Sequence, residues 1–200
     1  MGRMTAPRRI AGLVLAAGAG RRFGAPKPLA ELDGRPLLEH VLAALAAVPA
    51  LDRVAVTLGA HAEEILARVD LHGAEPIRVE QWAEGQAASL RAGVAALASG
   101  ADAILVTLGD QPLLTPATIV RVLDAWDGEA AAVRAVHGGR PGHPVLLTRR
   151  LYAAVAELRG DAGARSLLEA AGAVEVDCGS DAVLDVDTAA QLARLRFDPR

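Results

Sequence analysis

Short apolar segments alternate with amphipathic helical patterns through the first two thirds of the chain, and this alternation limits the possible folds. The apolar segments lie at residues 10–16, 53–58, 76–80 and 103–108. The helical patterns that follow them lie at residues 37–45, 61–69, 85–98 and 115–126. Strands that alternate with helices at this spacing form a mostly parallel sheet, because each helix returns the chain to begin the next strand. The pattern predicts an α/β fold with helices on both faces of the sheet.

The order of elements changes after residue 130. Strands are expected at residues 130–136 and 144–148, separated by a loop that contains Gly138, Gly139, Pro141 and Gly142. Helices at 149–158 and 164–171, two short strands and a terminal helix at 188–196 complete the pattern. No repeat or linker divides the 200 residues, so we expect one domain over 1–200, with residues 1–9 flexible.

Composition narrows the choice of partners. Hydrophobic residues make up 52% of the chain. The formal net charge is −3, and a slightly negative protein has no general attraction to nucleic acid or to an anionic membrane. No apolar run approaches the ~18 residues of a transmembrane helix. Arg8-Arg9 and the apolar run after them resemble a short secretory signal, but we expect this run to be the first strand. Cys178 is the only cysteine, which fits a cytoplasmic protein without disulfides.

A glycine-rich and basic segment follows the first predicted strand. It reads Leu15-Ala16-Ala17-Gly18-Ala19-Gly20-Arg21-Arg22-Phe23-Gly24-Ala25-Pro26-Lys27. Glycines let backbone N–H groups approach an anion closely, and the basic side chains add positive charge. The segment therefore predicts a phosphate-binding loop. Lys27 is the only lysine among 21 basic residues, which favours a specific role over the alternative of a solvated surface lysine.

Asp110 follows the most apolar predicted strand and is the second candidate site residue. Ligands of open α/β sheets bind outside the carboxyl ends of the strands, where both Asp110 and the glycine-rich loop are expected. A carboxylate that faces bound phosphates requires a cation between them, and Mg²⁺ fills this place in nucleotidyl transfer. The alternative is a simple turn residue before Gln111-Pro112. The dinucleotide fingerprint is excluded because Phe23 occupies its third glycine position, and no P-loop motif is present.

Several motifs together resemble the molybdopterin nucleotidyltransferase family of the NTP-transferase superfamily, and in particular its cytidylyltransferase branch. The first three are the segment 15–27, Gly34-Arg35-Pro36-Leu37-Leu38-Glu39-His40, and Trp82-Ala83-Glu84-Gly85 with Ser89-Leu90-Arg91-Ala92-Gly93. The others are Gly109-Asp110-Gln111-Pro112, Gly142-His143-Pro144-Val145-Leu146, Gly160-Asp161-Ala162-Gly163-Ala164-Arg165 and Asp185-Val186-Asp187-Thr188. They span residues 10–192, nearly the whole chain.

The resemblance implies both a fold and a reaction. The fold is a Rossmann-like three-layer sandwich of the nucleotide-diphospho-sugar transferase type, with a mostly parallel central sheet. The reaction is the Mg²⁺-dependent transfer of CMP from CTP to the terminal phosphate of molybdopterin, the molybdenum cofactor, with release of pyrophosphate. Ala17 favours CTP, because the guanylyl branch usually has a second glycine at that position.

The resemblance also implies roles for individual residues. The nucleotide-binding residues would be Leu15, Ala16, Ala17, Gly18, Ala19, Gly20, Arg22, Lys27, Gly85 and Ser89. The catalytic residues would be Lys27, Arg22 and Asp110. Asp110 would bind Mg²⁺ with Asp187 or Asp185, and His143 and Arg165 would contact the acceptor. For His143 the alternative is a loop histidine beside Pro144, and for Arg165 it is a surface ion pair.

Other functions stay open at this stage. A relative could use GTP with molybdopterin, or CTP with a sugar or polyol phosphate. A non-catalytic protein could bind the pterin cofactor and hand it to a partner enzyme. A nicotinamide-dependent dehydrogenase is disfavoured by Phe23. For the cytidylyltransferase, the expected partners are the two small-molecule substrates and a molybdenum hydroxylase that receives the product, with no nucleic acid and no membrane.

Overall fold

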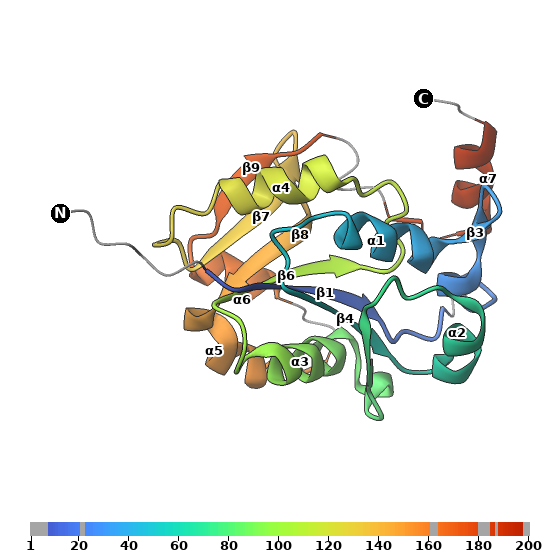
Figure 1. The fold of residues 1–200 in the computed structure, drawn as a ribbon, viewed down its shortest axis with the longest axis horizontal. Coiled ribbons are helices and arrows are strands. Elements are labelled where there is room, and N and C mark those ends of the chain that lie inside the picture. The colour runs from blue at the N-terminus through green and yellow to red at the C-terminus, as the bar shows by residue number, and fades with distance from the viewer. Residues whose placement is uncertain (1–7, 21–22, 161–163, 180–184, 187, 198–200) are drawn as a thin grey trace.

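A seven-stranded sheet forms the centre of the molecule. The computed structural model describes residues 8–20, 23–160, 164–179, 185–186 and 188–197. The strand order is β5-β4-β1-β6-β8-β7-β9 (Figure 1). The bounds are β1 Ile10–Ala16, β4 Arg53–Leu58, β5 Glu75–Arg78, β6 Ala103–Leu108, β7 Ala132–His137, β8 Arg140–Thr148 and β9 Val174–Asp177. A separate two-stranded ribbon is formed by β2 Glu31–Leu32 and β3 Arg35–Pro36.

The direction of the strands confirms the predicted mostly parallel sheet. Strands β5, β4, β1 and β6 are parallel neighbours, and β9 is parallel to β7. Only β8 runs antiparallel, against both β6 and β7. The carboxyl ends of β1 and β6 therefore lie beside each other at one edge of the sheet, with Leu15 paired to Leu108.

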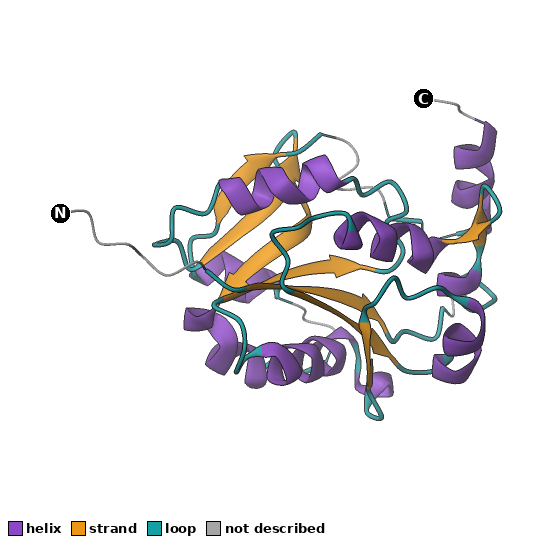
Figure 2. Cartoon of the chain, in the orientation of Figure 1, coloured by secondary structure: helices purple, strands orange, loops and turns teal. Residues whose placement is uncertain are grey.

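Helices cover both faces of the sheet (Figure 2). One face carries α1 Leu37–Ala46, α2 Ala62–Arg68 and α4 Pro116–Asp124, and the other carries α3 Gln86–Leu97, α5 Tyr152–Ala156 and α6 Arg165–Ala170. Short 3₁₀ turns lie at Lys27–Leu29 (η1), Trp82–Glu84 (η2) and Arg149–Leu151 (η3). The last helix, α7 Ala189–Phe197, contacts β2.

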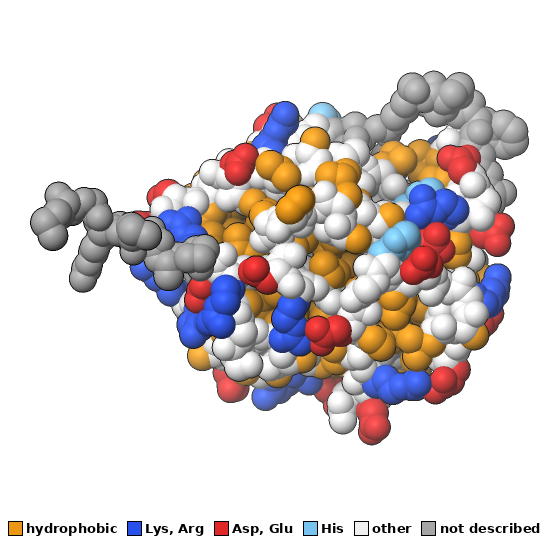
Figure 3. All heavy atoms as spheres, viewed as in Figure 1, with side chains coloured by type: hydrophobic (Ala, Val, Ile, Leu, Met, Phe, Trp, Pro, Cys, Tyr) orange, Lys and Arg blue, Asp and Glu red, His pale blue; other side chains and the backbone are white. Residues whose placement is uncertain are grey.

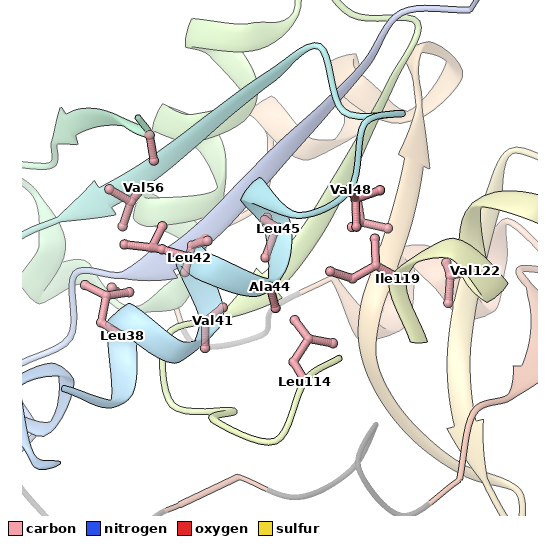
Figure 4. Packing of buried hydrophobic residues seen from close by; sticks show 14 of the residues in the cluster. Leu38, Val41, Leu42, Ala44, Leu45, Val48, Val56, Leu114, Ile119 and Val122 are labelled. Carbon is pink, nitrogen blue, oxygen red and sulfur yellow. The ribbon is translucent and has the colours of Figure 1, made fainter. Parts of the chain in front are cut away.

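Alternation along the central strands produces two hydrophobic cores, one on each face. In β1 the side chain of Val14 joins the core beneath α1 and α4, and the side chain of Leu13 joins the core above α3. Leu105 and Ile104 of β6 divide between the cores in the same way. Figure 4 shows the first core, where Leu38, Val41, Leu42 and Leu45 of α1 face the sheet. Because successive side chains of a strand point to opposite faces of the sheet, one apolar strand contributes to both cores.

Local signals explain where several elements begin. Thr115 caps α4, since its hydroxyl accepts a hydrogen bond from the Thr118 amide at 3.2 Å, and Pro116 occupies the first helical position. The carboxylates of Asp52 and Asp102 accept hydrogen bonds from the amides of Ile10 and Arg9. These contacts tie the start of β1 to the loops before β4 and β6.

Most predicted boundaries lie within two residues of the structure, and the largest difference concerns β8. Strand β8 begins at Arg140, so Pro141, Gly142 and His143 lie in a strand and not in a loop. The reason is a two-residue turn at Gly138 and Gly139, both with positive φ, which lets the flanking strands pair immediately. The predicted helix 149–158 divides into η3 and α5, β5 covers residues 75–78 instead of 76–80, and α7 begins at residue 189. Of the two short strands expected between residues 171 and 188, β9 is the one found among the described residues, and residues 180–184 lie outside them.

Charged side chains of both signs are mixed over the face shown in Figure 3, with apolar side chains between them. Among the described helices, none combines the length and apolarity needed to cross a lipid bilayer.

Candidate active site

The loop after β1 turns back on itself and forms one wall of a cavity. Gly20 has φ +64°, and a Cβ atom there would lie 2.6 Å from the backbone oxygen of Ala25. The amides of Phe23 and Gly24 both donate to the carbonyl of Gly20, at 2.9 and 3.2 Å. Only glycine fits this combination of left-handed backbone and close approach. The turn brings the chain back so that Lys27, at the start of η1, faces the loop.

A cavity of about 530 Å³ lies at the carboxyl ends of the central strands. Its walls include the predicted nucleotide-binding residues Leu15, Ala16, Ala17, Gly18, Ala19, Gly20, Lys27, Gly85 and Ser89. Asp110 lines the same cavity. The structure therefore brings these residues together from four separate segments. Arg22 lies outside the described residues.

Lys27 and Asp110 form an ion pair inside this cavity. The ammonium Nζ of Lys27 lies 2.5 Å from Oδ2 of Asp110, and the two side chains are only 13% and 23% exposed. The other carboxylate oxygen of Asp110, Oδ1, is buried and has no hydrogen-bond partner among the described residues. A buried acceptor without a partner is costly unless a ligand or ion satisfies it.

The segment before α3 also lines the cavity. Gly85 has φ +108° and joins η2 to α3. The side chain of Ser89, one turn into α3, is buried. Trp82 packs with Ala17, Val79 and Ala88 in a small apolar cluster that joins this segment to the first loop.

A second cavity of about 490 Å³ adjoins the first, and Leu15 and Gln86 line both of them. The predicted acceptor residues His143 and Arg165 both line this second cavity, together with Gln111 and Asp185. Burial lowers the pKa of His143 to about 4, and the nearby charge of Asp110 opposes this shift. The imidazole is therefore neutral near pH 7. We refer to the two spaces as the Lys27 cavity and the His143 cavity.

Gln86 and Arg134 line these cavities but are missing from the predicted site residues, as is Gln111. Gln86 stands at their junction, and its position as the first residue of a helix after the third strand is a usable signal. Arg134 of β7 lines the His143 cavity and pairs with Glu175 of the edge strand β9. No local pattern distinguishes Arg134 from the other 19 arginines of the sequence.

Of the three predicted metal ligands, Asp110 and Asp185 line different but adjoining cavities. Asp185 lines the His143 cavity, and its Oδ1 accepts a hydrogen bond from Nε2 of Gln111 at 2.7 Å. Asp110 lines the Lys27 cavity. Asp187 lies outside the described residues, and the described residues contain no group of three or more histidine, cysteine or acidic side chains in metal-binding geometry.

Two adjoining cavities at the carboxyl ends of β1 and β6 can hold two reactants side by side. An ammonium and a carboxylate lie in one cavity, and guanidinium groups and a neutral imidazole lie in the other. Such an arrangement suits the transfer of a group between two polar ligands. The order and direction of the strands, with a site at their carboxyl ends, are those of the nucleotide-diphospho-sugar transferase fold.

The chain belongs to the family of the MobA-like NTP transferase domain, which matches residues 12–176. It is 38% identical over 200 residues to nicotine blue oxidoreductase of Paenarthrobacter nicotinovorans, covering 93% of this chain and 96% of that protein. It is 35% identical over 164 residues to the bifunctional protein GlmU of Rhizorhabdus wittichii, covering 81% of this chain. The match spans only about a third of GlmU, 34% of its length.

Solved structures agree with this membership. The crystal structure of Rv0371c from Mycobacterium tuberculosis H37Rv is similar with a TM-score of 0.87 and 31% identity, covering 97% of this chain and all of that one. Its complex with manganese gives a TM-score of 0.82 and 29% identity, covering 96% of this chain and all of that one. The chain is thus a nucleotidyltransferase of the MobA-like family.

Proposed function

We propose that the protein transfers CMP from CTP to the terminal phosphate of molybdopterin, with release of pyrophosphate. The observation that supports this reaction best is the pair of adjoining cavities, one with Lys27 and Asp110 and the other with His143 and Arg165. CTP occupies the Lys27 cavity in this proposal, and molybdopterin occupies the His143 cavity. The α-phosphorus then lies at the junction that Leu15 and Gln86 share.

In the Lys27 cavity, the backbone from Ala17 to Gly20 surrounds the triphosphate and Lys27 neutralises part of its charge. Gly85 and Ser89 contact the base, and Gly85 lets the backbone approach it closely. Lys27 also stabilises the charge that develops as pyrophosphate leaves. Fixed charges that face a developing charge in a partly buried site are a large source of catalysis. Arg22 adds a second positive charge to the same loop.

A divalent cation fits this site because Oδ1 of Asp110 is buried and has no partner among the described residues. Hard divalent cations such as Mg²⁺ prefer carboxylate oxygens and phosphate oxygens as ligands. When bound, the cation would polarise the phosphates and offset the negative charge of Asp110. We propose Asp110 and Asp187 as its protein ligands, with Asp185 as the alternative second ligand. The manganese complex of Rv0371c supports a divalent metal in this family.

In the His143 cavity, Arg165 binds an anionic group of molybdopterin through its planar guanidinium, which suits bidentate contacts to phosphate. His143 is neutral and can donate one hydrogen bond and accept another. An oxygen of the acceptor phosphate attacks the α-phosphorus as the bond to pyrophosphate breaks, and no covalent bond to the protein forms.

A redox function is the second candidate, because the relative that matches over nearly its whole length is named nicotine blue oxidoreductase. In this case the two adjoining cavities would hold the two halves of a nicotinamide dinucleotide, or one dinucleotide and an organic electron acceptor. The absence of the third fingerprint glycine, at Phe23, weighs against this candidate.

Nucleotide titration separates these functions. We expect CTP with Mg²⁺ to raise the melting temperature more than GTP, ATP, UTP, NADH or NADPH, and the Asp110→Ala variant to lose this shift. Glu75→Gln, on the far edge strand, serves as the control and keeps it. Turnover with molybdopterin and CTP, followed by pyrophosphate release, then tests the acceptor. A larger rise in melting temperature with GTP than with CTP refutes the proposed cytidine nucleotide. A rise with NADH or NADPH but with none of the nucleoside triphosphates refutes nucleotidyl transfer.

The location and the recipient of the product follow from the proposed reaction. We place the protein in the cytoplasm, where its single cysteine stays reduced. A molybdenum hydroxylase would receive the dinucleotide product.

A further inference from the structure

Gln111 is almost completely buried, at 1% exposed, although it is polar and next to the site carboxylate Asp110. Both polar atoms of its amide have partners. Oε1 accepts a hydrogen bond from the hydroxyl of Thr107 at 3.1 Å, and Nε2 donates to Oδ1 of Asp185 at 2.7 Å. Thr107 is itself fully buried in β6. A buried amide is tolerated when every polar atom is satisfied in this way.

The Asp185 carboxylate determines which end of the Gln111 amide faces it, and the Thr107 hydroxyl, which can donate or accept, donates to the amide oxygen Oε1. An ionised carboxylate only accepts hydrogen bonds, so the NH₂ group must point toward Asp185, and this hydrogen bond is of the stronger, charge-assisted kind. The opposite orientation would place the amide oxygen against a carboxylate oxygen. The contact is long-range, since 74 residues separate Gln111 from Asp185.

A second hydrogen bond joins the same two segments. The amide of Val186 donates to the backbone carbonyl of Asp110 at 3.0 Å. Val186 is fully buried and packs with Leu32, Leu37 and Leu192. The segment 185–186 is therefore held beside Asp110 and Gln111 by one backbone contact and one side-chain contact.

Asp110 and Gln111 are neighbours that face different cavities. Asp110 lines the Lys27 cavity, whereas Gln111 and Asp185 line the His143 cavity. We infer that Gln111 is a positioning residue that holds the Asp185 carboxylate at the wall of the His143 cavity, where Asp185 selects the acceptor. This inference rests on the proposed function in that it takes the His143 cavity as the acceptor cavity.

Four variants test the inference. Gln111→Leu removes the hydrogen bond, and Gln111→Glu keeps the shape but places a carboxylate against Asp185. The double variant, Gln111→Glu with Asp185→Asn, restores a hydrogen bond between these two positions, with the donor now on residue 185 and the acceptor on residue 111. Thr107→Val leaves the Gln111 amide in place but removes the hydrogen-bond donor to its Oε1 atom, and we expect a weaker effect in the same direction as Gln111→Leu.

The expected result is a separation between the two substrates. Gln111→Leu raises the KM for molybdopterin about tenfold or more, as expected for the loss of a hydrogen bond to a charged group. Its Kd for CTP, measured by calorimetry, stays within about twofold of the original protein. The double variant regains the melting temperature that Gln111→Glu loses, but its KM for molybdopterin stays high because residue 185 no longer carries a carboxylate. Recovery of this KM, or an equal loss of CTP affinity in Gln111→Leu, overturns the inference.

Hydrogen exchange provides a readout that does not depend on the reaction. We expect the amide of Val186 to exchange faster in Gln111→Leu, while amides in the middle of β4 stay unchanged. Unchanged exchange at Val186 also overturns the inference. If the original protein shows no turnover with molybdopterin, the proposed function fails, and this measurement still decides whether Gln111 holds the segment.

Discussion

The ammonium group of Lys27 lies 2.5 Å from Oδ2 of Asp110, although 83 residues separate them. This contact joins the loop after β1 to the end of β6. From the sequence, we expected a metal cation to balance the carboxylate beside the phosphate-binding loop. In the structure the side chain of Lys27 balances it directly, and the second oxygen of Asp110 faces no described partner.

Removal of either member of this pair should impair catalysis. We expect Lys27→Ala and Asp110→Ala each to lower turnover by about 10²-fold or more, as for the loss of a preorganised charge contact. Pyrophosphate release with CTP and molybdopterin measures the effect. The control is Arg53→Ala, which breaks an exposed ion pair with Glu75 at the opposite end of β4 and should keep its turnover. Full activity of either site variant contradicts the proposed roles.

The tight turn at Gly20 should be needed for nucleotide binding. In Gly20→Ala the new methyl group meets the Ala25 carbonyl oxygen at 2.6 Å, so the loop that carries Lys27 must shift. We expect CTP affinity to fall about tenfold or more, consistent with the cost of a strained backbone position. Gly24→Ala is a matched control, since Gly24 also has positive φ but no atom of the described residues lies within 4 Å of the new Cβ. Calorimetric titration with CTP compares them, and equal losses would argue against the close contact.

The contact between α3 and β1 should limit the size of residue 93. A Cβ atom at Gly93 would lie 2.5 Å from the side chain of the fully buried Leu13. Gly93→Val should lower the free energy of unfolding by roughly 1–3 kcal/mol, the usual cost of an overpacked core. In contrast, Gly100→Ala meets nothing closer than 3.6 Å and should change it by less than about 0.5 kcal/mol. Urea denaturation with unchanged m-values measures both, and a neutral Gly93→Val would contradict the packing.

The stability of the protein in acid should depend on His143. Its pKa is about 4 in the folded protein and 6.5 is the ordinary value, so between these values the unfolded chain binds the proton and the folded protein does not. The free energy of unfolding should therefore fall as the pH drops from 6.5 to 4. His143→Gln should show a shallower fall over this window in denaturation series. An NMR titration that places the His143 pKa near 6.5 would refute the prediction.

Part of the fold was predictable because it depends on local patterns. The predicted strands at 10–16, 53–58 and 103–108 coincide with β1, β4 and β6. Each is a mostly apolar run with a glycine one or two residues after its end, which is typical of strands buried on both faces. In contrast, the start of β8 was missed, because Pro141 and Gly142 are typical of loops and only pairing with β7 makes them a strand.

The sequence by itself determined the chemistry that is available: a glycine-rich loop, a single lysine, and a carboxylate after the most apolar strand. These features are local, and a strand end or a turn can be located without knowing its neighbours. The tertiary structure alone decided that β6 lies next to β1, which brings Asp110 to Lys27. It also decided that Asp185 pairs with Gln111 and lines the second cavity. Such contacts depend on the strand order and on packing between distant segments, and the periodicity of one segment carries no information about its partner.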